Sequence, residues 1–194
     1  MMKKYTSHPR HLLLLSTVLM LFMACNGCKN DPKTTATSTP ITGNNVYVRL
    51  GTEPNSLNLL TTEDASSIQV GNQIFQSLLE FDPKTLELTP VLAKSRPTIV
   101  HVDTGSCKGG ASYTYEIREE ATWSDGAPVT SADVVFTIKA ILNKKSGAGN
   151  YRSSIDFIKN ITIDAANPKK FTVWTDKRYI LAEANVGTVP IFSE

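Results

Sequence analysis

The sequence predicts an α/β fold of the mixed α+β kind, because a strand pattern and a helix pattern follow each other closely. In residues 113–118 (YTYEIR) apolar and polar side chains alternate, which is the period of a strand that buries one face. In residues 134–142, valine, isoleucine and leucine recur at i, i+4, i+7 and i+8, which is one apolar helical stripe. A sheet covered by a helix is therefore expected.

Residues 123–126 (WSDG) lie between these two patterns and predict a tight turn. Gly126 can adopt a positive φ, and serine and aspartate side chains can accept bonds from nearby backbone N–H groups. Thr130 is expected to cap the next helix, with Asp133 at capping-box spacing. Tryptophan and aspartate also recur in sugar-binding sites, but turn geometry explains this stretch, and we predict a structural role for it.

The ordered part is expected to begin with a strand at residues 46–50, where Val46, Val48 and Leu50 alternate. A polar segment follows and leads to a helix that Ser66 or Ser67 would cap. Ligands of α/β folds lie beyond the carboxyl ends of strands, so this polar segment is a candidate for ligand contact. The buried side of the helix is expected to hold Ile68, Gly71, Phe75, Leu78 and Leu79, with Ile74 also apolar.

Two strand pairs are expected farther along the chain. Residues 99–102 and 112–117 would pair across the loop 103–111, and residues 158–163 would pair with 170–175 across the Asn-Pro turn at 167–168. The helix from Ser131 would cover one face of the resulting sheet. One unit of about 110 residues is large enough to hold its own core.

The N-terminus has the pattern of a secretory signal. Basic residues precede an apolar run at 12–24, which is too short to span a bilayer and ends directly before Cys25. A small residue followed by cysteine resembles a bacterial lipoprotein signal, with cleavage before Cys25 and lipid on its sulfur. Cys28 is a second candidate for lipidation, and an ordinary secreted protein with a buried or bridged Cys25 is the alternative.

The rest of the composition limits the function classes. Loss of the three positive charges in residues 1–24 changes the formal net charge from +2 to −1, so the basic pI does not argue for a nucleic-acid partner. Residues 25–45 are rich in Thr, Ser, Asn and Pro and are expected to form a flexible tether. A disulfide between Cys28 and Cys107 is possible in an oxidising compartment, but nothing in the sequence favours it. His101 is the one histidine after residue 24, and no metal-ligand spacing is present, so we expect no enzyme, no metal and no cofactor.

Several ordered blocks resemble one known family. These are RLGTEPNSLNLL from Arg49, QIFQSLLEFDP from Gln73, VLAKS from Val91, and YTYEIR followed by WSDGAPVTSADV from Tyr113. They resemble the extracytoplasmic oligopeptide- and dipeptide-binding proteins of ABC importers, which form solute-binding protein family 5. Ser131 replaces the alanine that is common in the family's turn motif. The resemblance runs from residue 46 to the C-terminus.

The resemblance implies a fold, a function and a location. Residues 46–76 would begin the first lobe of a periplasmic-binding-protein fold, residues 77–189 would form the family's additional α+β domain, and residues 190–194 would return towards the first lobe. The second lobe is absent from the sequence, so an N-terminal fragment is expected. The protein would capture a peptide or small solute on the periplasmic side of the cell envelope, anchored in the membrane by its lipid, and deliver it to an ABC permease.

The resemblance also implies ligand-binding residues. Thr62, Glu63, Asp64 and Ala65 occupy the segment that gives main-chain hydrogen bonds to an extended peptide, and Tyr151 stands where an aromatic residue often lies at the cleft mouth. The alternatives are a solvated loop at 62–65 and a tyrosine that closes the core of its own domain. Two other functions remain open, namely a non-transporting surface or sensor lipoprotein, and a receptor for nickel or sugar.

Overall fold

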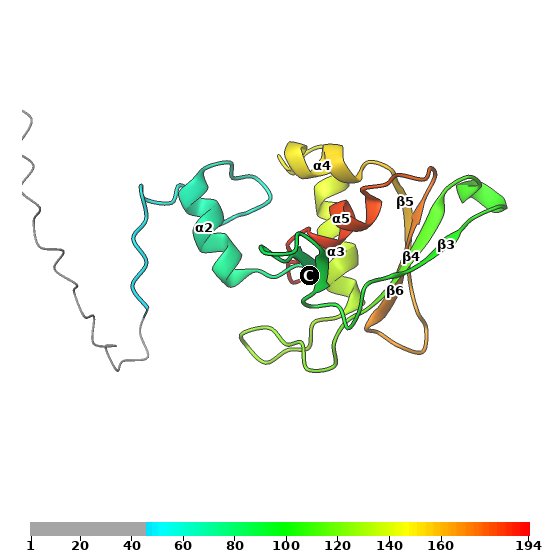
Figure 1. Cartoon of the computed structure of the whole chain (residues 1–194), viewed down its shortest axis with the longest axis horizontal. Helices are drawn as coiled ribbons and strands as arrows, with labels where there is room; N and C mark the ends of the chain where they lie inside the picture. Colours follow the sequence, from blue (N-terminus) through cyan, green and yellow to red (C-terminus); the bar gives the residue numbers. More distant parts are fainter. Residues whose placement is uncertain (1–45) are drawn as a thin grey trace, which may run out of the picture. The chain divides into compact units, whose positions relative to one another are not determined.

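A four-stranded antiparallel sheet organises the structure, a computed structural model that describes residues 46–194. The strands lie in the order β3-β4-β6-β5 (Figure 1). Residues Val48–Glu194 form one compact unit, and Val46 and Tyr47 belong to the segment before it. The strand bounds are β3 (Thr98–His101), β4 (Ala111–Glu116), β5 (Ile158–Ile163) and β6 (Lys170–Thr175).

Both predicted strand pairs are confirmed. In the centre of the sheet, Tyr113 of β4 lies opposite Ile99 of β3 on one side and Val173 of β6 on the other. Strand β5 pairs with β6 up to Ile163, which lies opposite Phe171. The alternation in the sequence determines this register, because a shift by one residue would move every apolar side chain to the opposite face.

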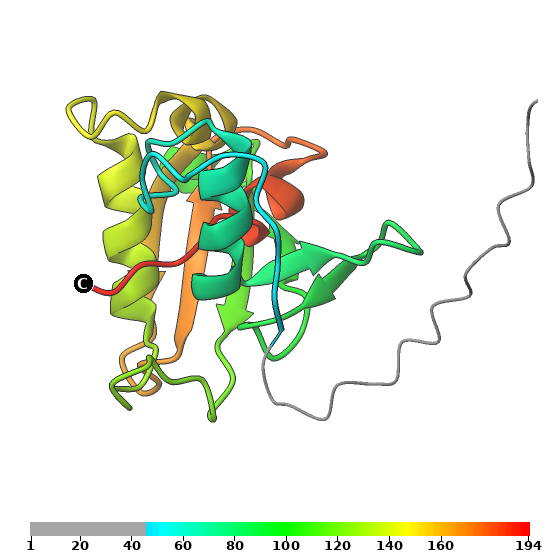
Figure 2. The same cartoon turned by 90° about the vertical axis from the view of Figure 1, so that its left-hand side faces the viewer.

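Helix α3 (Ser131–Leu142) packs on one face of the sheet, as predicted (Figure 2). Its buried side chains include Val134, Ile138 and Ile141, and Thr130 and Asp133 form a capping box at its start. Two short helices follow in the chain, α4 (Gly149–Ile155) and α5 (Ala182–Gly187).

The core lies between the sheet and these helices. The rings of Tyr115 and Phe171 are stacked with centroids 5.5 Å apart, and both side chains are 1% exposed. Burial of one large apolar side chain contributes about 1.5–3 kcal/mol, so the alternating positions of β4 and β6 supply much of the driving force for folding.

A separate two-stranded sheet was not predicted. It consists of β1 (Leu79–Phe81) and β2 (Leu88–Pro90) and forms a hairpin. Isolated bridges from Ser77 to Pro190 and from Ala93 to Ile117 connect the ends of this hairpin to the rest of the unit.

The predicted strand at residues 46–50 is wrong. These residues have no regular structure, and Val46, Tyr47 and Val48 are 87%, 90% and 64% exposed. A strand needs a hydrogen-bonded neighbour, and no strand within residues 46–194 pairs with this segment. The alternation is therefore present without the pairing that would make it a strand here.

Helix α2 (Ala65–Ile74) differs from the prediction at both ends. Asp64 is the N-cap, and its Oδ1 accepts the Ser67 backbone N–H at 2.8 Å. Ser67 Oγ instead accepts the Ser56 backbone N–H at 3.1 Å and fastens the preceding loop. The helix ends before Phe75, so Leu78 and Leu79 are buried beyond the helix, at the start of the hairpin.

The turn predicted at residues 123–126 is confirmed. Gly126 has φ of 87°, its N–H donates to the Trp123 carbonyl at 3.0 Å, and Asp125 Oδ1 accepts the Ala127 N–H at 2.9 Å. A short 3-10 helix, η2 (Gly105–Cys107), lies in the β3–β4 loop with Cys107 buried. Cys25 and Cys28 lie outside the described residues. Within residues 46–194, none of the helices has the length and apolarity of a membrane span.

Candidate functional site

A cavity of about 380 Å³ lies between the segment before α2 and the start of α4. It brings together Thr62, Glu63 and Tyr151, three of the five predicted ligand-binding residues, although Tyr151 is far from the other two in sequence. Asp64 and Ala65 lie next to the cavity in sequence but do not line it. The full lining consists of Leu60, Thr61, Thr62, Glu63, Ile68, Gly147, Gly149, Asn150 and Tyr151.

The segment before α2 is a folded turn. Asn58 holds it, because the Asn58 carbonyl accepts the backbone N–H groups of Thr61 at 3.2 Å and of Thr62 at 3.1 Å. The Asn58 side chain accepts the Leu60 N–H at 3.0 Å. The main-chain donor of Thr62 is therefore already bonded within the loop.

The Asp64 side chain acts within the fold. Its carboxylate accepts the Ser67 backbone N–H and the Thr62 hydroxyl, the latter at 2.8 Å. Hydrogen bonds from Ser67, with the Thr62 hydroxyl as a weaker contributor, lower the pKa of Asp64 below its ordinary value. This carboxylate therefore caps α2 and is negatively charged at neutral pH.

Ala65 carries a main-chain N–H that the prediction assigns to ligand contact. It is the first residue of α2, and the first N–H groups of a helix have no carbonyl partner within that helix. Ala65 is exposed, and its contact with a ligand stays a prediction.

Glu63 is held by a residue that sequence reasoning missed. The Asn150 side-chain N–H donates to Glu63 Oε1 at 2.7 Å, across 87 positions of sequence. Asn150 precedes Tyr151 directly, but no spacing or composition signal relates it to Glu63. Only the packing of α4 beside the segment before α2 brings the pair together.

Tyr151 is half-buried at the start of α4, between the hydrophobic core and the cavity. Its ring packs against the hydrophobic core and also lines the cavity. Burial raises the pKa of Tyr151, so the phenol is neutral and keeps its O–H donor at physiological pH. Both sequence interpretations of this residue, a cleft residue and a core residue, fit its position.

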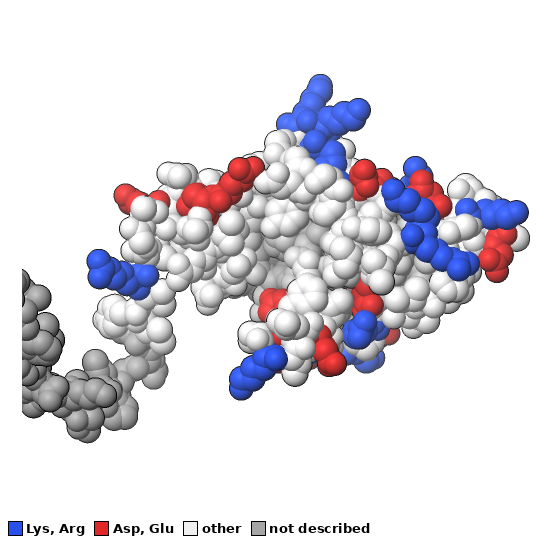
Figure 3. Space-filling view, turned by 45° about the horizontal axis from the view of Figure 1, so that its top comes forward, with Lys and Arg blue, Asp and Glu red and all other residues white. Residues whose placement is uncertain are grey.

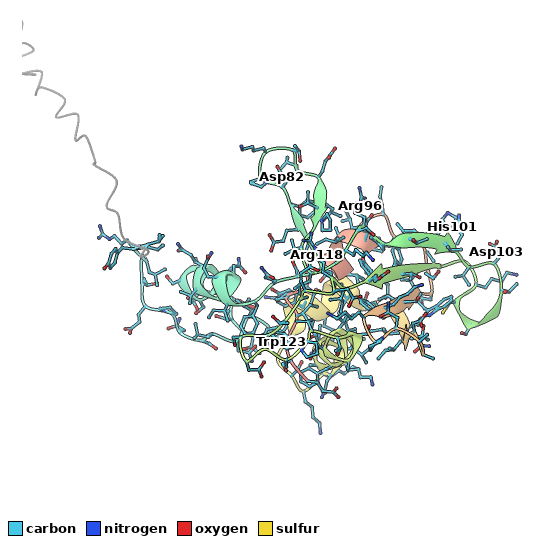
Figure 4. The ribbon with its side chains drawn as sticks, turned by 90° about the horizontal axis from the view of Figure 1, so that it is seen from below. Asp82, Arg96, His101, Asp103, Arg118 and Trp123 are labelled. Atoms are coloured by element: carbon cyan, nitrogen blue, oxygen red, sulfur yellow. The ribbon has the colours of Figure 1, made fainter. Side chains whose placement is uncertain are left out.

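Two further hollows lie at the other end of α2. Trp123 and Ser124 of the turn line one of about 430 Å³ together with Phe75, and Arg118 and Glu120 line a neighbouring one of about 440 Å³. The Arg118 guanidinium donates to the carbonyls of Pro90 and Ala93, so it is engaged in the fold (Figure 4). These hollows contain none of the predicted ligand residues.

His101 is exposed on the edge strand β3, and Figure 4 shows it with Asp103 far from Trp123. Within residues 46–194, no group of three His, Cys, Asp or Glu side chains is arranged to hold a metal ion. Acidic and basic side chains are interspersed on the face shown in Figure 3, with wide uncharged areas between them.

Comparisons with known proteins place this structure among solute-binding proteins. The oligopeptide-binding protein AppA of Bacillus subtilis is 29% identical over 155 residues, which cover 77% of this chain and 27% of AppA. OppA of Listeria monocytogenes, solved bound to peptide, superposes with a TM-score of 0.56 at 21% identity, covering 71% of this chain and 29% of OppA. NikZ of Campylobacter jejuni, solved with Ni(L-His), gives a TM-score of 0.53 at 27% identity, covering 72% of this chain and 26% of NikZ.

The chain thus spans about a quarter of the length of these relatives. The family model for the middle part of the bacterial extracellular solute-binding proteins, family 5, matches residues 87–191, which is more than half of the chain. The same residues carry the sheet, α3 and the WSDG turn. The chain therefore belongs to family 5 of the bacterial extracellular solute-binding proteins.

Proposed function

We propose that this chain is part of the receptor of an ABC importer and captures peptides outside the cytoplasmic membrane. The observation that carries the proposal is the cavity that joins Thr62 and Glu63 to Tyr151. The similarity to proteins described as oligopeptide-binding, and to OppA solved with peptide, supports it. The family consists of binding proteins, so the proposed role is binding and delivery to a permease, without catalysis.

The chemistry of the site suits a peptide main chain. An extended peptide presents carbonyl and N–H groups at regular intervals. Hydrogen bonds to these main-chain groups recognise any peptide, whatever its side chains. The Ala65 N–H, which lies outside the cavity lining, is the donor proposed for one such bond, and the Tyr151 ring is proposed as an apolar wall. In this proposal residues 46–76 begin the first lobe, residues 77–189 form the additional domain, and residues 190–194 return towards the lobe. Hinge closure of two lobes would complete the cleft.

The proposal includes a lipid anchor. The apolar run that ends at Cys25 supports cleavage there and lipid attachment to its sulfur. This would place the receptor on the periplasmic side of the envelope, tethered to a membrane. Two or more acyl chains are what stable anchoring requires.

Ala65→Pro tests the main-chain contact directly. Proline is favoured at the first helical position, and Asp64, with φ of −80° and ψ of 141°, already has the extended backbone that a residue before proline needs. The substitution therefore removes one N–H and leaves α2 intact. We expect peptide affinity to fall about fivefold, because one hydrogen bond contributes about 1 kcal/mol. Calorimetry on the protein as the cell makes it would measure this.

Ala65→Ser is the matched control, since it keeps the N–H and should bind as the parent protein does. Unchanged affinity of Ala65→Pro, with unchanged thermal stability, would show that this main-chain group does not contact the ligand. Mass spectrometry of small peptides that co-purify with the protein tests capture itself. Their absence would favour a non-transporting surface or sensor lipoprotein.

A nickel complex is the second candidate ligand, because NikZ with Ni(L-His) is among the similar structures. The two ligands are separated by titrating the protein with nickel and histidine together and, separately, with a tripeptide. Heat from the first titration alone would assign the site to nickel.

A further inference from the structure

We propose that the cavity selects ligands with a protonated amine or guanidinium, that Glu63 receives this cation, and that Asn150 is the positioning residue that holds Glu63. The inference rests on the proposed peptide-binding function and adds the class of ligand and the residue that sets the preference.

The first step concerns the charge of the cavity. Of the nine described residues that line it, Glu63 alone is charged. The three ion pairs found within residues 46–194 are those of Lys94, Arg96 and Lys159, and Glu63 belongs to none of them. The Asp64 carboxylate, next in sequence but outside the lining, is occupied by the Thr62 hydroxyl and the Ser67 N–H. The cavity therefore presents negative charge to whatever enters it.

The second step concerns Arg152, the basic residue that directly follows the cavity-lining Tyr151 in sequence. Its guanidinium donates to the carbonyls of Ile141 at 2.9 Å and Asn143 at 2.7 Å, and to the Ser146 hydroxyl at 3.3 Å. These bonds fix Arg152 against the end of α3. Arg152 therefore does not neutralise Glu63.

The third step concerns the partner that Glu63 does have. The Asn150 amide is neutral, so its 2.7 Å hydrogen bond fixes one carboxylate oxygen without cancelling the charge. Glu63 is an exposed residue with several rotatable bonds, and it would lose entropy on binding a cation if it were free. Asn150 removes part of that cost in advance, because α4 holds it. The second oxygen stays available for a ligand.

The fourth step concerns the wall around Glu63. Leu60, Ile68 and the half-buried Tyr151 ring line the same cavity. An aromatic ring favours a cation over its face. A protonated amine is thus the ligand group that best matches this combination of one carboxylate, one aromatic ring and aliphatic side chains.

Two sources could supply the cation, the peptide α-ammonium group or a lysine or arginine side chain. Four tripeptides separate them: Ala-Lys-Ala, its norleucine analogue Ala-Nle-Ala, and the N-acetylated form of each. Calorimetry on the protein as the cell makes it gives four affinities. We expect acetyl-Ala-Nle-Ala to bind most weakly, and at least one cationic peptide to bind about fivefold more tightly.

Two variants test the assigned roles. Glu63→Gln should remove the preference for cationic peptides, measured on the variant itself as the ratio of each cationic peptide's affinity to that of acetyl-Ala-Nle-Ala. Asn150→Ala should reduce the preference about twofold to threefold while the melting temperature stays the same, which a purely structural role would not produce. Glu80→Gln and Asn160→Ala are the matched controls, since both residues are exposed and do not line the cavity, and they should keep the full preference.

The outcomes distinguish the two levels of the proposal. If all four peptides bind with equal affinity, the proposed function holds and the cation preference is wrong. If Glu63→Gln keeps the preference, Glu63 is not the receiving group. If none of the four peptides binds, the proposed function fails and the inference fails with it.

Discussion

Leu86 is the one non-glycine residue with a positive φ among residues 46–194. Its φ of 58° lies in the left-handed region, which costs a side chain with a Cβ about 1–2 kcal/mol, and its side chain is 73% exposed. It follows the turn in which Asp82 Oδ1 accepts the N–H groups of Lys84 and Thr85 at 2.8 and 2.9 Å. The turn at the end of the β1–β2 hairpin therefore imposes this conformation.

Leu86→Gly should stabilise the protein. Glycine adopts positive φ without strain, and its greater freedom in the unfolded chain offsets part of the gain, so we expect a net increase of about 0.5–1 kcal/mol in the free energy of unfolding. Urea denaturation measures it. Leu86→Ala is the control, because it removes the exposed side chain and keeps the Cβ. A Gly variant no more stable than the Ala variant would show that the backbone is unstrained.

At single positions, the sequence predicted turns and helix caps correctly where they depend on residues a few positions apart. Gly126 in its turn and Thr130 with Asp133 at the start of α3 were found, because each relies on neighbours within a few residues. The cap of α2 was misassigned to Ser66 or Ser67, since residues 64–67 (DASS) offer three capping side chains within four positions and packing decides among them. Asn150 was missed for a different reason, because its partner Glu63 is distant in sequence.

At the scale of one element, the start of α2 should respond to acid. Because Ser67 hydrogen bonds lower the pKa of Asp64, the carboxylate is charged and capping above its ordinary value of 3.8, and this stabilisation is lost as the pH falls through the lower folded-state pKa. The amide proton shift of Ser67, followed by NMR, should titrate with a midpoint below 3.8. Asp64→Asn should abolish the titration. A midpoint above 3.8 would contradict the hydrogen bonds described for this cap.

The strands show when the alternation of apolar and polar residues is enough to predict a strand. The pairs β3–β4 and β5–β6 were predicted because strands that are close in sequence and alternate in polarity form hairpins readily. Residues 46–50 alternate equally well yet form no strand, because a strand also needs a partner with free backbone groups. The pairing of β1 with β2 was not predicted, because each strand has only three residues and the helix prediction extended over Leu79.

At the scale of the molecule, the fold class was predictable and the site only in part. The mixed α/β architecture follows from patterns that repeat along the whole described chain, and family membership agrees with it. The cavity depends on α4 meeting the segment before α2, which no local pattern indicates. The resemblance nevertheless singled out Thr62, Glu63 and Tyr151, which line one cavity, because it carries information about positions in space that periodicity lacks. Their contact with a ligand stays a prediction.

The membrane anchor concerns the whole molecule and depends on one sulfur. If Cys25 is lipidated, Cys25→Ser should release the protein from the membrane fraction and abolish incorporation of a fatty-acid analogue, since the acyl chains supply the binding energy at about 0.8 kcal/mol per buried CH₂. Cys28→Ser is the matched control, three residues on, and should leave labelling and membrane association intact. The reverse result, with release by Cys28→Ser alone, would move the cleavage site to the second cysteine. Release by neither substitution would show that the protein is held by contacts other than a lipid, and the receptor would then need a protein partner to stay near its permease.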